Sequence, residues 1–495
     1  MAIIPRTMGT QHPDNVASPK FLKANGSHPG VLSRGEEIAE ALWFYNLGGA
    51  EQMWDFEGKV GDNQVVFELF SQAHDFFKKN PLGKEKFLTI RIPNPFIEKD
   101  DSKILMEVLE SIARFRDVAK VFFGEDAEVP VFEVILPMAT SAEELHIIST
   151  LYSDFVAGKQ DAIIAGTELT VGDILGDYRP KSINVIPLFE SMEAMLNADK
   201  IVARYREGLN LEYQRVFLAR SDPALNYGSL AAVLLLNIAL LKLHRLQKDS
   251  IPIYPILGVG SPAFRGNFKP TTTASMLAGY PSCATFTVQS AFKYDWPEFM
   301  VKEAINLINS SDIEAPLEID IEKSVKLIEK IVPSYQAQIG LIAPLVNSLS
   351  EYIPRRRLRR QHTGLFGYSR KAGEVKLPRV INFCASLYSI GLPPEIFGLH
   401  VLDRDDLRVV GYNYPNPNFQ EDMREALAYF NPECFGLIDP RLKDDINKAI
   451  RIVDFEMNKE HALVTSEIVC CLKRGQTDGL NELIEEAGRV RRFLG

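Results

Sequence analysis

The chain has 495 residues, of which 46% are hydrophobic and 24% charged, and its formal net charge is −10. This composition is typical of a folded globular protein and excludes a largely disordered one. The acidic balance, with a pI near 5.5, argues against sequence-independent nucleic-acid binding, which depends on Lys and Arg neutralising phosphates. An anionic ligand would therefore have to be held by local positive charge.

The cysteine content and the hydropathy predict a cytoplasmic protein that does not associate with a membrane. The five cysteines are odd in number and lack any C-x-x-C spacing, so neither a disulfide framework nor a structural zinc site is indicated. No stretch of signal-peptide length opens the chain. The most apolar segment, residues 230–241, is interrupted by Asn237 and is shorter than the ~20 residues that span a bilayer. It is predicted to be a buried helix.

Short apolar runs alternate with helix-like segments in the first 300 residues. About eight such runs are expected to form strands, which predicts a (β/α)8 TIM-type barrel. They lie at residues 52–56, 87–92, 119–123, 131–136, 183–189, 215–219, 251–257 and 285–289.

Beyond residue 300 the apolar residues recur at helical spacing, which predicts a large α-helical C-terminal portion. Its expected helices cover residues 319–331, 335–352, 442–452 and 480–490. We therefore expect residues 1–300 to form a catalytic barrel and residues 301–495 to pack with it as one unit. The second region is expected to contribute active-site arginines and oligomer contacts.

Two acids and an arginine follow consecutive strand-like runs. Glu190 and Asp222 come directly after two of them, and Arg265 lies in a glycine-rich loop after the third. Because the carboxyl ends of strands in such repeats gather on one face, the three side chains are expected to converge. Paired carboxylates suit a hard cation such as Mg²⁺. The alternative is that each acid merely caps or begins a helix.

Other candidates carry less specific signals. Arg91 stands inside a strand-like run, where it would either face a polar active centre or neutralise Asp55 or Glu57. His12, in a polar N-terminal loop, belongs to the residue type that titrates near neutrality and transfers protons. The basic run at residues 355–360 would bind an anion or pair with the acidic surplus as a solvated loop.

Several of these segments resemble, in order along the chain, motifs of phosphoenolpyruvate carboxylase in its short, archaeal-type form. The residues around His12, G-T-Q-H-P-D-N, resemble the family's N-terminal histidine motif. The segment P-L-F-E-S at residues 187–191 is similar to P-L-F-E-T, whose Glu binds metal. The segment F-L-A-R-S-D-P-A-L-N-Y-G at residues 217–228 resembles M-I-G-Y-S-D-S-A-K-D-A-G, whose first Asp is the second metal ligand.

Two further segments supply arginines by the same resemblance. The loop ending in Arg265 resembles F-H-G-R-G-G-x-x-G-R-G-G, which carries a catalytic arginine, and L-P-R-V-I at residues 377–381 resembles L-R-A-I-P, which makes Arg379 a phosphate ligand. A histidine, an arginine and a lysine of the long-form enzymes are replaced here by Leu257, Val259 and Leu225. Arg220, which replaces a tyrosine, is a candidate to restore the lost charge.

The resemblance implies carboxylation of phosphoenolpyruvate with bicarbonate, giving oxaloacetate and phosphate through carboxyphosphate and a metal-bound pyruvate enolate. Glu190 and Asp222 would hold Mg²⁺ or Mn²⁺, and no biotin would be needed. Arg265 and Arg379, with Arg91 or Arg220, would hold the phosphoryl group, and His12 would act on carboxyphosphate. A homotetramer is implied, whereas control by aspartate or acetyl-CoA stays open.

Two other functions fit parts of the pattern. A metal-dependent aldolase or lyase of the pyruvate-enolate barrel group would also use paired acids, but it would need neither several phosphate-directed arginines nor bicarbonate. A non-catalytic scaffold barrel would bind a partner and no metal.

Overall fold

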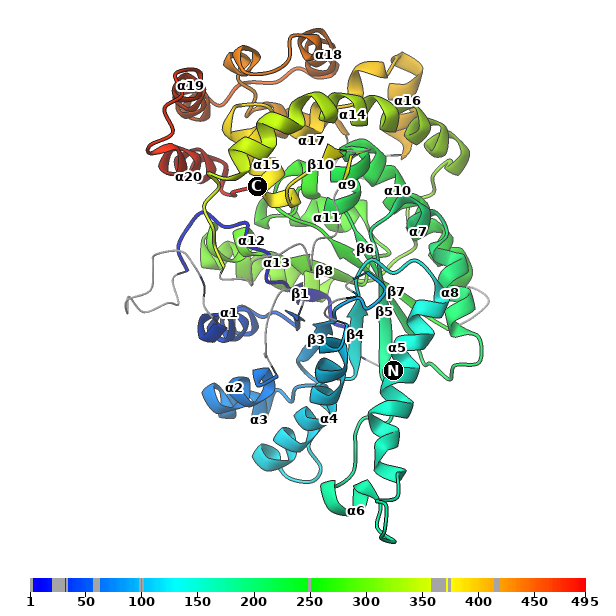
Figure 1. Ribbon diagram of the computed structural model, residues 1–495. Helices are drawn as coiled ribbons and strands as arrows, with labels where there is room; N and C mark the ends of the chain where they lie inside the picture. The colour runs from blue at the N-terminus through cyan, green and yellow to red at the C-terminus, as the bar shows by residue number, and fades with distance from the viewer. Residues whose placement is uncertain are drawn as a thin grey trace.

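The computed structural model describes residues 3–19, 32, 34–56, 63–97, 99, 102–247, 251–357, 371–372, 375–413 and 419–495. Eight parallel strands close into a barrel in chain order, so the predicted fold class is confirmed (Figure 1). The strands are β1 (Thr7–Gly9), β2 (Glu51–Asp55), β3 (Phe87–Arg91), β4 (Glu133–Leu136), β5 (Asn184–Phe189), β6 (Gln214–Ala219), β7 (Ile253–Gly258) and β8 (Thr285–Val288).

One predicted strand is wrong and one observed strand was missed. Residues 119–123 form the last turns of the helix Ile104–Phe123, whose buried residues recur at helical spacing. β1 closes the barrel by pairing with both β2 and β8, yet it has only three residues and so gives almost no periodic signal. The expected strand number was therefore right although one member of the set was not.

Helices follow most of the strands and make up the rest of the chain. The barrel helices are α1 (Arg34–Asn46), α2 (Val65–Gln72), α3 (His74–Lys79), α4 (Ile104–Phe123), α5 (Ala142–Phe155), α6 (Val171–Leu175), α7 (Met192–Leu196), α8 (Ala198–Arg206), α9 (Ser221–Tyr227), α10 (Ser229–Gln247), α11 (Thr273–Gly279), α12 (Ser290–Tyr294) and α13 (Glu298–Ser310). The C-terminal helices are α14 (Ile321–Ser350), α15 (Val380–Ser389), α16 (Arg404–Asn413), α17 (Phe419–Leu427), α18 (Arg441–Ala449), α19 (Lys459–Lys473) and α20 (Leu480–Arg491). A short antiparallel pair, β9 (Lys371–Ala372) and β10 (Val375–Lys376), precedes α15.

The helices α14 to α20 lie together on one side of the barrel, whereas α6 projects from the opposite side (Figure 1). The two helices predicted at residues 319–331 and 335–352 are one continuous helix, α14, with Pro333 and Pro344 inside it. A proline removes one helical hydrogen bond, but packing can outweigh that loss. Here Tyr335 is buried and its hydroxyl donates to the Leu225 carbonyl at 2.8 Å, which ties α14 to α9.

One helix among the described residues, α10, is long and apolar enough to cross a membrane. The bent pair Val380–Ser389 and Pro394–Val401 would be a second only if its 101° bend lay within one span. In α10, 78% of the apolar window is buried inside the fold, against α7, α8, α9 and α14. Such burial is typical of a core helix, as the sequence predicts.

The barrel interior is filled by side chains. An apolar layer is formed by Met8, Met53, Ile135, Ile186, Leu188, Phe217, Ala219 and Ile256. At the amino ends of the strands, Arg215 donates from Nη2 to Glu51 at 2.7 Å and from Nη1 to Glu133 at 2.9 Å. This buried ionic cluster closes one end of the barrel and leaves the other end for the candidate site.

Candidate active site

Seven polar side chains lie at or just after the carboxyl ends of barrel strands, the end at which TIM-barrel enzymes carry their active sites. Each is the last residue of a strand or lies in the loop or first helical turn that follows it. They are His12 after β1, Asp55 on β2, Arg91 on β3, Glu190 after β5, Asp222 after β6, Arg265 after β7 and Gln289 after β8.

His12 lies among several of these groups. Its Nδ1 is 2.9 Å from the Thr10 hydroxyl. Burial lowers the pKa of His12 well below its ordinary value, and the positive charges of Arg91 and Arg265 lower it further. The carboxylates of Asp55 and Asp222 act on the same pKa in the opposite direction. Two predicted arginines and one predicted metal ligand therefore lie within electrostatic reach of His12, whose imidazole is held neutral.

Arg91 pairs with Asp55 and also faces His12. Its Nε and Nη2 donate to the two Asp55 carboxylate oxygens at 3.0 and 2.7 Å, a bidentate geometry. Both interpretations of Arg91 are thus compatible. Asp55 pairs with the arginine inside the barrel, and the same guanidinium acts on the pKa of His12. Glu57, the other acid considered for this pair, lies outside the described residues.

Glu190 and Asp222 differ in how they relate to their helices. The side chain that caps α7 is Ser191, which accepts from the Ala194 amide, so Glu190 precedes the cap. Glu190 is 8% exposed and accepts from the Met138 amide at 2.8 Å. Asp222 does lie in the first turn of α9. The capping explanation therefore fails for Glu190 and describes only the position of Asp222.

The two carboxylates offer the oxygen donors that Mg²⁺ and Mn²⁺ prefer. Across the parts of the chain that the structure describes, no three His, Cys, Asp or Glu side chains gather as a potential metal site. A site of this kind needs only one or two carboxylates, because water and substrate oxygens complete the octahedron. The donor chemistry of Glu190 and Asp222 thus fits the expected cation, and their role as its ligands stays a prediction.

Arg265 is completely buried in the loop after β7, at the end of a single 3-10 turn, Ala263–Arg265. Its Nη1 donates to Asp14 at 3.3 Å and to the Gly495 carbonyl at 2.5 Å, and its Nη2 donates to the Gln289 side chain. Gly260 makes room for this fold-back, since a Cβ there would lie 2.9 Å from Cζ of Arg265. The glycine at position 260 is thus explained by close approach of the guanidinium.

Arg220 also packs against that loop, since a Cβ at Gly266 would lie 3.5 Å from its Cγ. It is 1% exposed, and its Nη2 donates to the Ser229 hydroxyl at 2.9 Å. Its Nε and Nη1 have no hydrogen-bond partner among the described residues. The charge of Arg220 acts on buried Glu395, whose carboxylate accepts from the Phe264 amide next to Arg265. Arg220 thus lies beside the loop that carries Arg265.

Arg379 is exposed at the start of α15, a helix that packs against α9, which carries Asp222. In the basic run, Arg356 and Arg357 are buried rather than solvated. Arg356 pairs with Glu485 at 2.5 Å, and Arg357 pairs with Glu40. The expectation that the run pairs with acids is confirmed for these two residues. The expectation of a solvated loop is wrong for them, because both are buried. Residues 358–360 lie outside the described chain.

Several residues of the site escaped the sequence reasoning. Asp14 joins Arg265 to the Ala291 amide, which donates to its Oδ1 at 2.8 Å. Gln289 directly follows β8, a position that would have marked it as a candidate. Met138 adopts a positive φ of 52°, rare for a non-glycine residue, where its amide meets Glu190. No sequence signal announces that backbone conformation.

Comparison with known proteins gives full-length matches. A family model described as phosphoenolpyruvate carboxylase matches residues 4–495. The chain is 45% identical to the phosphoenolpyruvate carboxylase of Methanospirillum hungatei JF-1, over 99% of this chain and 100% of that one. It is 43% identical to the corresponding proteins of Halobacterium salinarum and Pyrococcus abyssi, each over 100% of both chains.

Among solved structures, an HpcH/HpaI aldolase from Desulfitobacterium hafniense DCB-2 matches with a TM-score of 0.30 and 11% identity. The match covers 58% of this chain and 87% of that one. A likeness this low carries no argument about activity.

Proposed function

Since this chain belongs to the phosphoenolpyruvate carboxylase family, in its short, archaeal-type form, we propose that it joins phosphoenolpyruvate to bicarbonate and releases oxaloacetate and phosphate. The observation that carries the proposal is the position of His12, whose imidazole is under the influence of Arg91, Arg265 and Asp222 at the carboxyl end of the barrel. A histidine, two arginines and a carboxylate thereby lie close enough to act together in the proposed site.

The phosphoryl group and the carboxylate of the substrate require positive charge in a molecule whose net charge is −10. In the proposed site, Arg91 at the end of β3 and Arg265 in the loop after β7 would supply it, and Arg379 would add a third guanidinium from the exposed start of α15. A divalent cation held by Glu190 and Asp222 would supply Lewis-acid stabilisation for the enol oxygen when bound. Planar guanidinium groups suit the oxygens of a phosphoryl group because they bind in a bidentate manner.

In the proposed first step, a bicarbonate oxygen attacks the phosphorus, and the bond from phosphorus to the enol oxygen breaks. Carboxyphosphate and the enolate of pyruvate result. Negative charge moves onto the phosphoryl oxygens and then onto the enolate. Preorganised arginines stabilise that redistribution most where water is excluded, and the guanidinium of Arg265 is fully buried.

In the second step, carboxyphosphate releases CO₂ and phosphate, and the enolate carbon attacks CO₂ to form oxaloacetate. His12 would take the carboxyl proton of carboxyphosphate. Because burial and the neighbouring arginines lower its pKa, the imidazole of His12 is neutral near pH 7 and so has a ring nitrogen that can accept the proton. For bicarbonate itself we propose Arg220, whose two unpartnered buried nitrogens are available donors.

The activity is tested by supplying phosphoenolpyruvate, Mg²⁺ and bicarbonate labelled with ¹⁸O, and by coupling oxaloacetate to malate dehydrogenase. We expect oxaloacetate and phosphate in equal amounts, with label from the attacking oxygen in the phosphate. A lyase of the pyruvate-enolate group would release no phosphate under these conditions. Oxaloacetate formation without label in phosphate would contradict the carboxyphosphate route.

We also propose that the protein works as a homotetramer in the cytoplasm. All five cysteines are free thiols, and three of them, Cys283, Cys384 and Cys434, are buried. Free thiols are typical of reducing compartments, which supports the location.

A further inference from the structure

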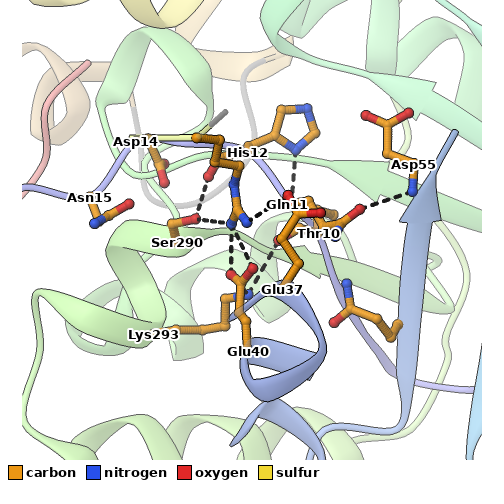
Figure 2. Close-up of polar contacts among 12 residues, drawn as sticks. Thr10, Gln11, His12, Asp14, Asn15, Glu37, Glu40, Asp55, Ser290 and Lys293 are labelled. Atoms are coloured by element: carbon orange, nitrogen blue, oxygen red, sulfur yellow. Dashed lines mark hydrogen bonds and ion pairs between the residues drawn. The ribbon is translucent and has the colours of Figure 1, made fainter. Parts of the chain in front are cut away.

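A cluster of buried charges lies beneath the loop that carries His12 (Figure 2). Lys293, on α12, donates to Glu40 of α1 at 2.6 Å. Arg357 contacts the other oxygen of Glu40 at 2.7 Å and contacts Glu37 at 3.3 Å. All four side chains are at most 5% exposed. Three segments far apart in the sequence are thus joined by ion pairs.

The cluster is connected to the backbone of the His12 loop at two points. Lys293 Nζ donates to the Thr10 carbonyl at 3.2 Å. Arg357 Nη2 donates to the Ser290 hydroxyl at 3.2 Å, and that hydroxyl donates to the His12 carbonyl. Figure 2 shows Ser290, Lys293 and Glu40 below the loop and the His12 ring above it. The cluster therefore holds the carbonyls of Thr10 and His12, the two neighbours of Gln11 in the chain.

The charges of the cluster compensate one another. Burial alone would raise the pKa of Glu40, but Arg357 and Lys293 outweigh it and lower the pKa to about 2. Burial lowers the pKa of Lys293, and Glu40 opposes that shift. A buried ion cluster of this kind usually stabilises a fold no better than apolar packing would. Because this cluster lies under the His12 loop, it can instead fix the geometry of that loop.

We propose that Lys293, Glu40, Arg357 and Ser290 are positioning residues, which fix the backbone of residues 10–12 and thereby hold the His12 imidazole over the site. The link to carboxyphosphate chemistry rests on the proposed function, whereas the anchoring of the ring does not. None of the four side chains needs to touch substrate in this scheme. Their effect on the reaction passes through the Thr10 and His12 carbonyls.

The chain offers a matched control at the other end of the barrel. The cluster of Arg215 with Glu51 and Glu133 is also buried, also joins one arginine to two glutamates, and lies at the amino ends of the strands. Arg215→Met and Lys293→Met each remove one cation from a buried ionic cluster; Arg357 remains in the second case. Both are expected to lower Tm, and only the second is expected to move His12.

The first measurement is independent of activity. The eight histidines are labelled with ¹³C at Cε1, and the His12 resonance is assigned with His12→Gln. In Lys293→Met we expect the His12 resonance to shift and its pKa to rise towards the ordinary value, because a ring that loses its fixed place is less buried and lies farther from Arg91 and Arg265. Asp55 and Asp222, the other charges that act on the ring, raise its pKa, so movement away from them makes the expected rise smaller. Lys293→Arg should restore the wild-type signal in large part.

The second measurement is the ratio of phosphate to oxaloacetate formed from phosphoenolpyruvate. A mispositioned His12 leaves the first step intact, so carboxyphosphate is hydrolysed to bicarbonate and phosphate and the enolate takes up a proton to give pyruvate. We therefore expect the ratio to rise at least twofold in Lys293→Met. KM for phosphoenolpyruvate should change less than kcat. Arg215→Met should keep the wild-type ratio even though its Tm falls.

The proposal is overturned if the His12 resonance and its titration in Lys293→Met match the wild type, or if Arg215→Met shifts them equally. Should Lys293→Met fail to fold, Ser290→Ala, which removes one hydroxyl, is judged by the same His12 signal. If the wild-type protein forms no oxaloacetate, the proposed function fails, and the resonance alone still decides whether the cluster holds the ring.

Discussion

Arg265 is the residue of the site with the most fully determined geometry. Asp14, Gln289 and the Gly495 carbonyl each accept from its guanidinium, and together they fix the plane of that group. Because the three acceptors come from the N-terminal loop, from the end of β8 and from the last residue of the chain, the orientation depends on the whole fold. A residue held in this way is suited to binding an anion in one geometry only.

We predict that Arg265→Lys lowers kcat by about 10²-fold, since an ammonium keeps the charge but lacks the planar fork. Steady-state kinetics with saturating bicarbonate measure this loss. The exposed Arg408, substituted to Lys, is the matched control and should leave kcat unchanged. A loss of less than about tenfold at Arg265 would remove it from the group that stabilises the transferred phosphoryl.

For the two carboxylates, we predict that Glu190→Gln and Asp222→Asn each abolish tight Mg²⁺ or Mn²⁺ binding while the fold is retained. An amide keeps the shape of the carboxyl group and removes the negative charge that a hard cation requires. Isothermal titration calorimetry measures the affinity, and circular dichroism monitors the fold. Glu168→Gln, at an exposed position, serves as the control. Unchanged metal affinity in both variants would place the cation elsewhere.

At the scale of elements, the contact between α19 and α20 contains a histidine that is kept neutral. His461, 1% exposed, accepts at Nε2 from Arg491 at 2.8 Å. Burial lowers the pKa of His461 to about 2, and the Arg491 charge contributes. Arg491 also donates to the Leu494 carbonyl, next to the Gly495 carbonyl that meets Arg265. The packing of two C-terminal helices is thus linked to the site.

His461 should make the protein sensitive to acid. The unfolded chain binds a proton at His461 below about pH 6.5, and the folded protein does not bind it until about pH 2. Acidification from pH 7 to pH 5 therefore favours unfolding, by about 2 kcal/mol for this group. We predict that His461→Gln, which keeps an acceptor for Arg491, loses less Tm between pH 7 and pH 5 than the wild type.

The control for this measurement is His74→Gln, at an exposed position, which should lose as much Tm as the wild type over the same pH interval. Differential scanning calorimetry at both pH values gives the comparison. An equal loss in His461→Gln and wild type would show that other groups govern the acid sensitivity.

At the scale of the whole molecule, a segment around α6 is left uncovered by the fold. No residue of α6 is buried, and the segment extends away from the barrel in Figure 1. Its large apolar side chains are strongly exposed: Phe155 58%, Ile163 71%, Leu169 46%, Ile174 59% and Leu175 65%. Apolar surface of this kind is typical of an interface between proteins. We expect the proposed tetramer to use it.

We therefore predict that the double substitution Ile174→Asp and Leu175→Asp lowers the molar mass in solution, measured by light scattering coupled to size-exclusion chromatography. Two buried charges in an interface oppose association. Val121→Asp is the control, because Val121 is 84% exposed and belongs to α4 rather than to this segment. An unchanged mass in the double variant would assign assembly to another surface.

The sequence alone determined the barrel, because seven apolar runs have the length and spacing of buried strands, and it marked the residues that follow them. Strand ends are local in sequence, so Glu190, Asp222 and Arg265 could be placed at one end of the barrel before any contact was known. The family motifs around His12 and Arg379 could also be recognised because each is a short, continuous stretch of sequence.

Only the tertiary structure decided how these groups are held. Asp14 on Arg265, Lys293 under the His12 loop and Glu40 against Arg357 are contacts between residues hundreds of positions apart or on unrelated elements, and no period in the sequence encodes them. The depressed pKa of His12 follows from the same cause, since burial and neighbouring charge exist only once the chain has closed.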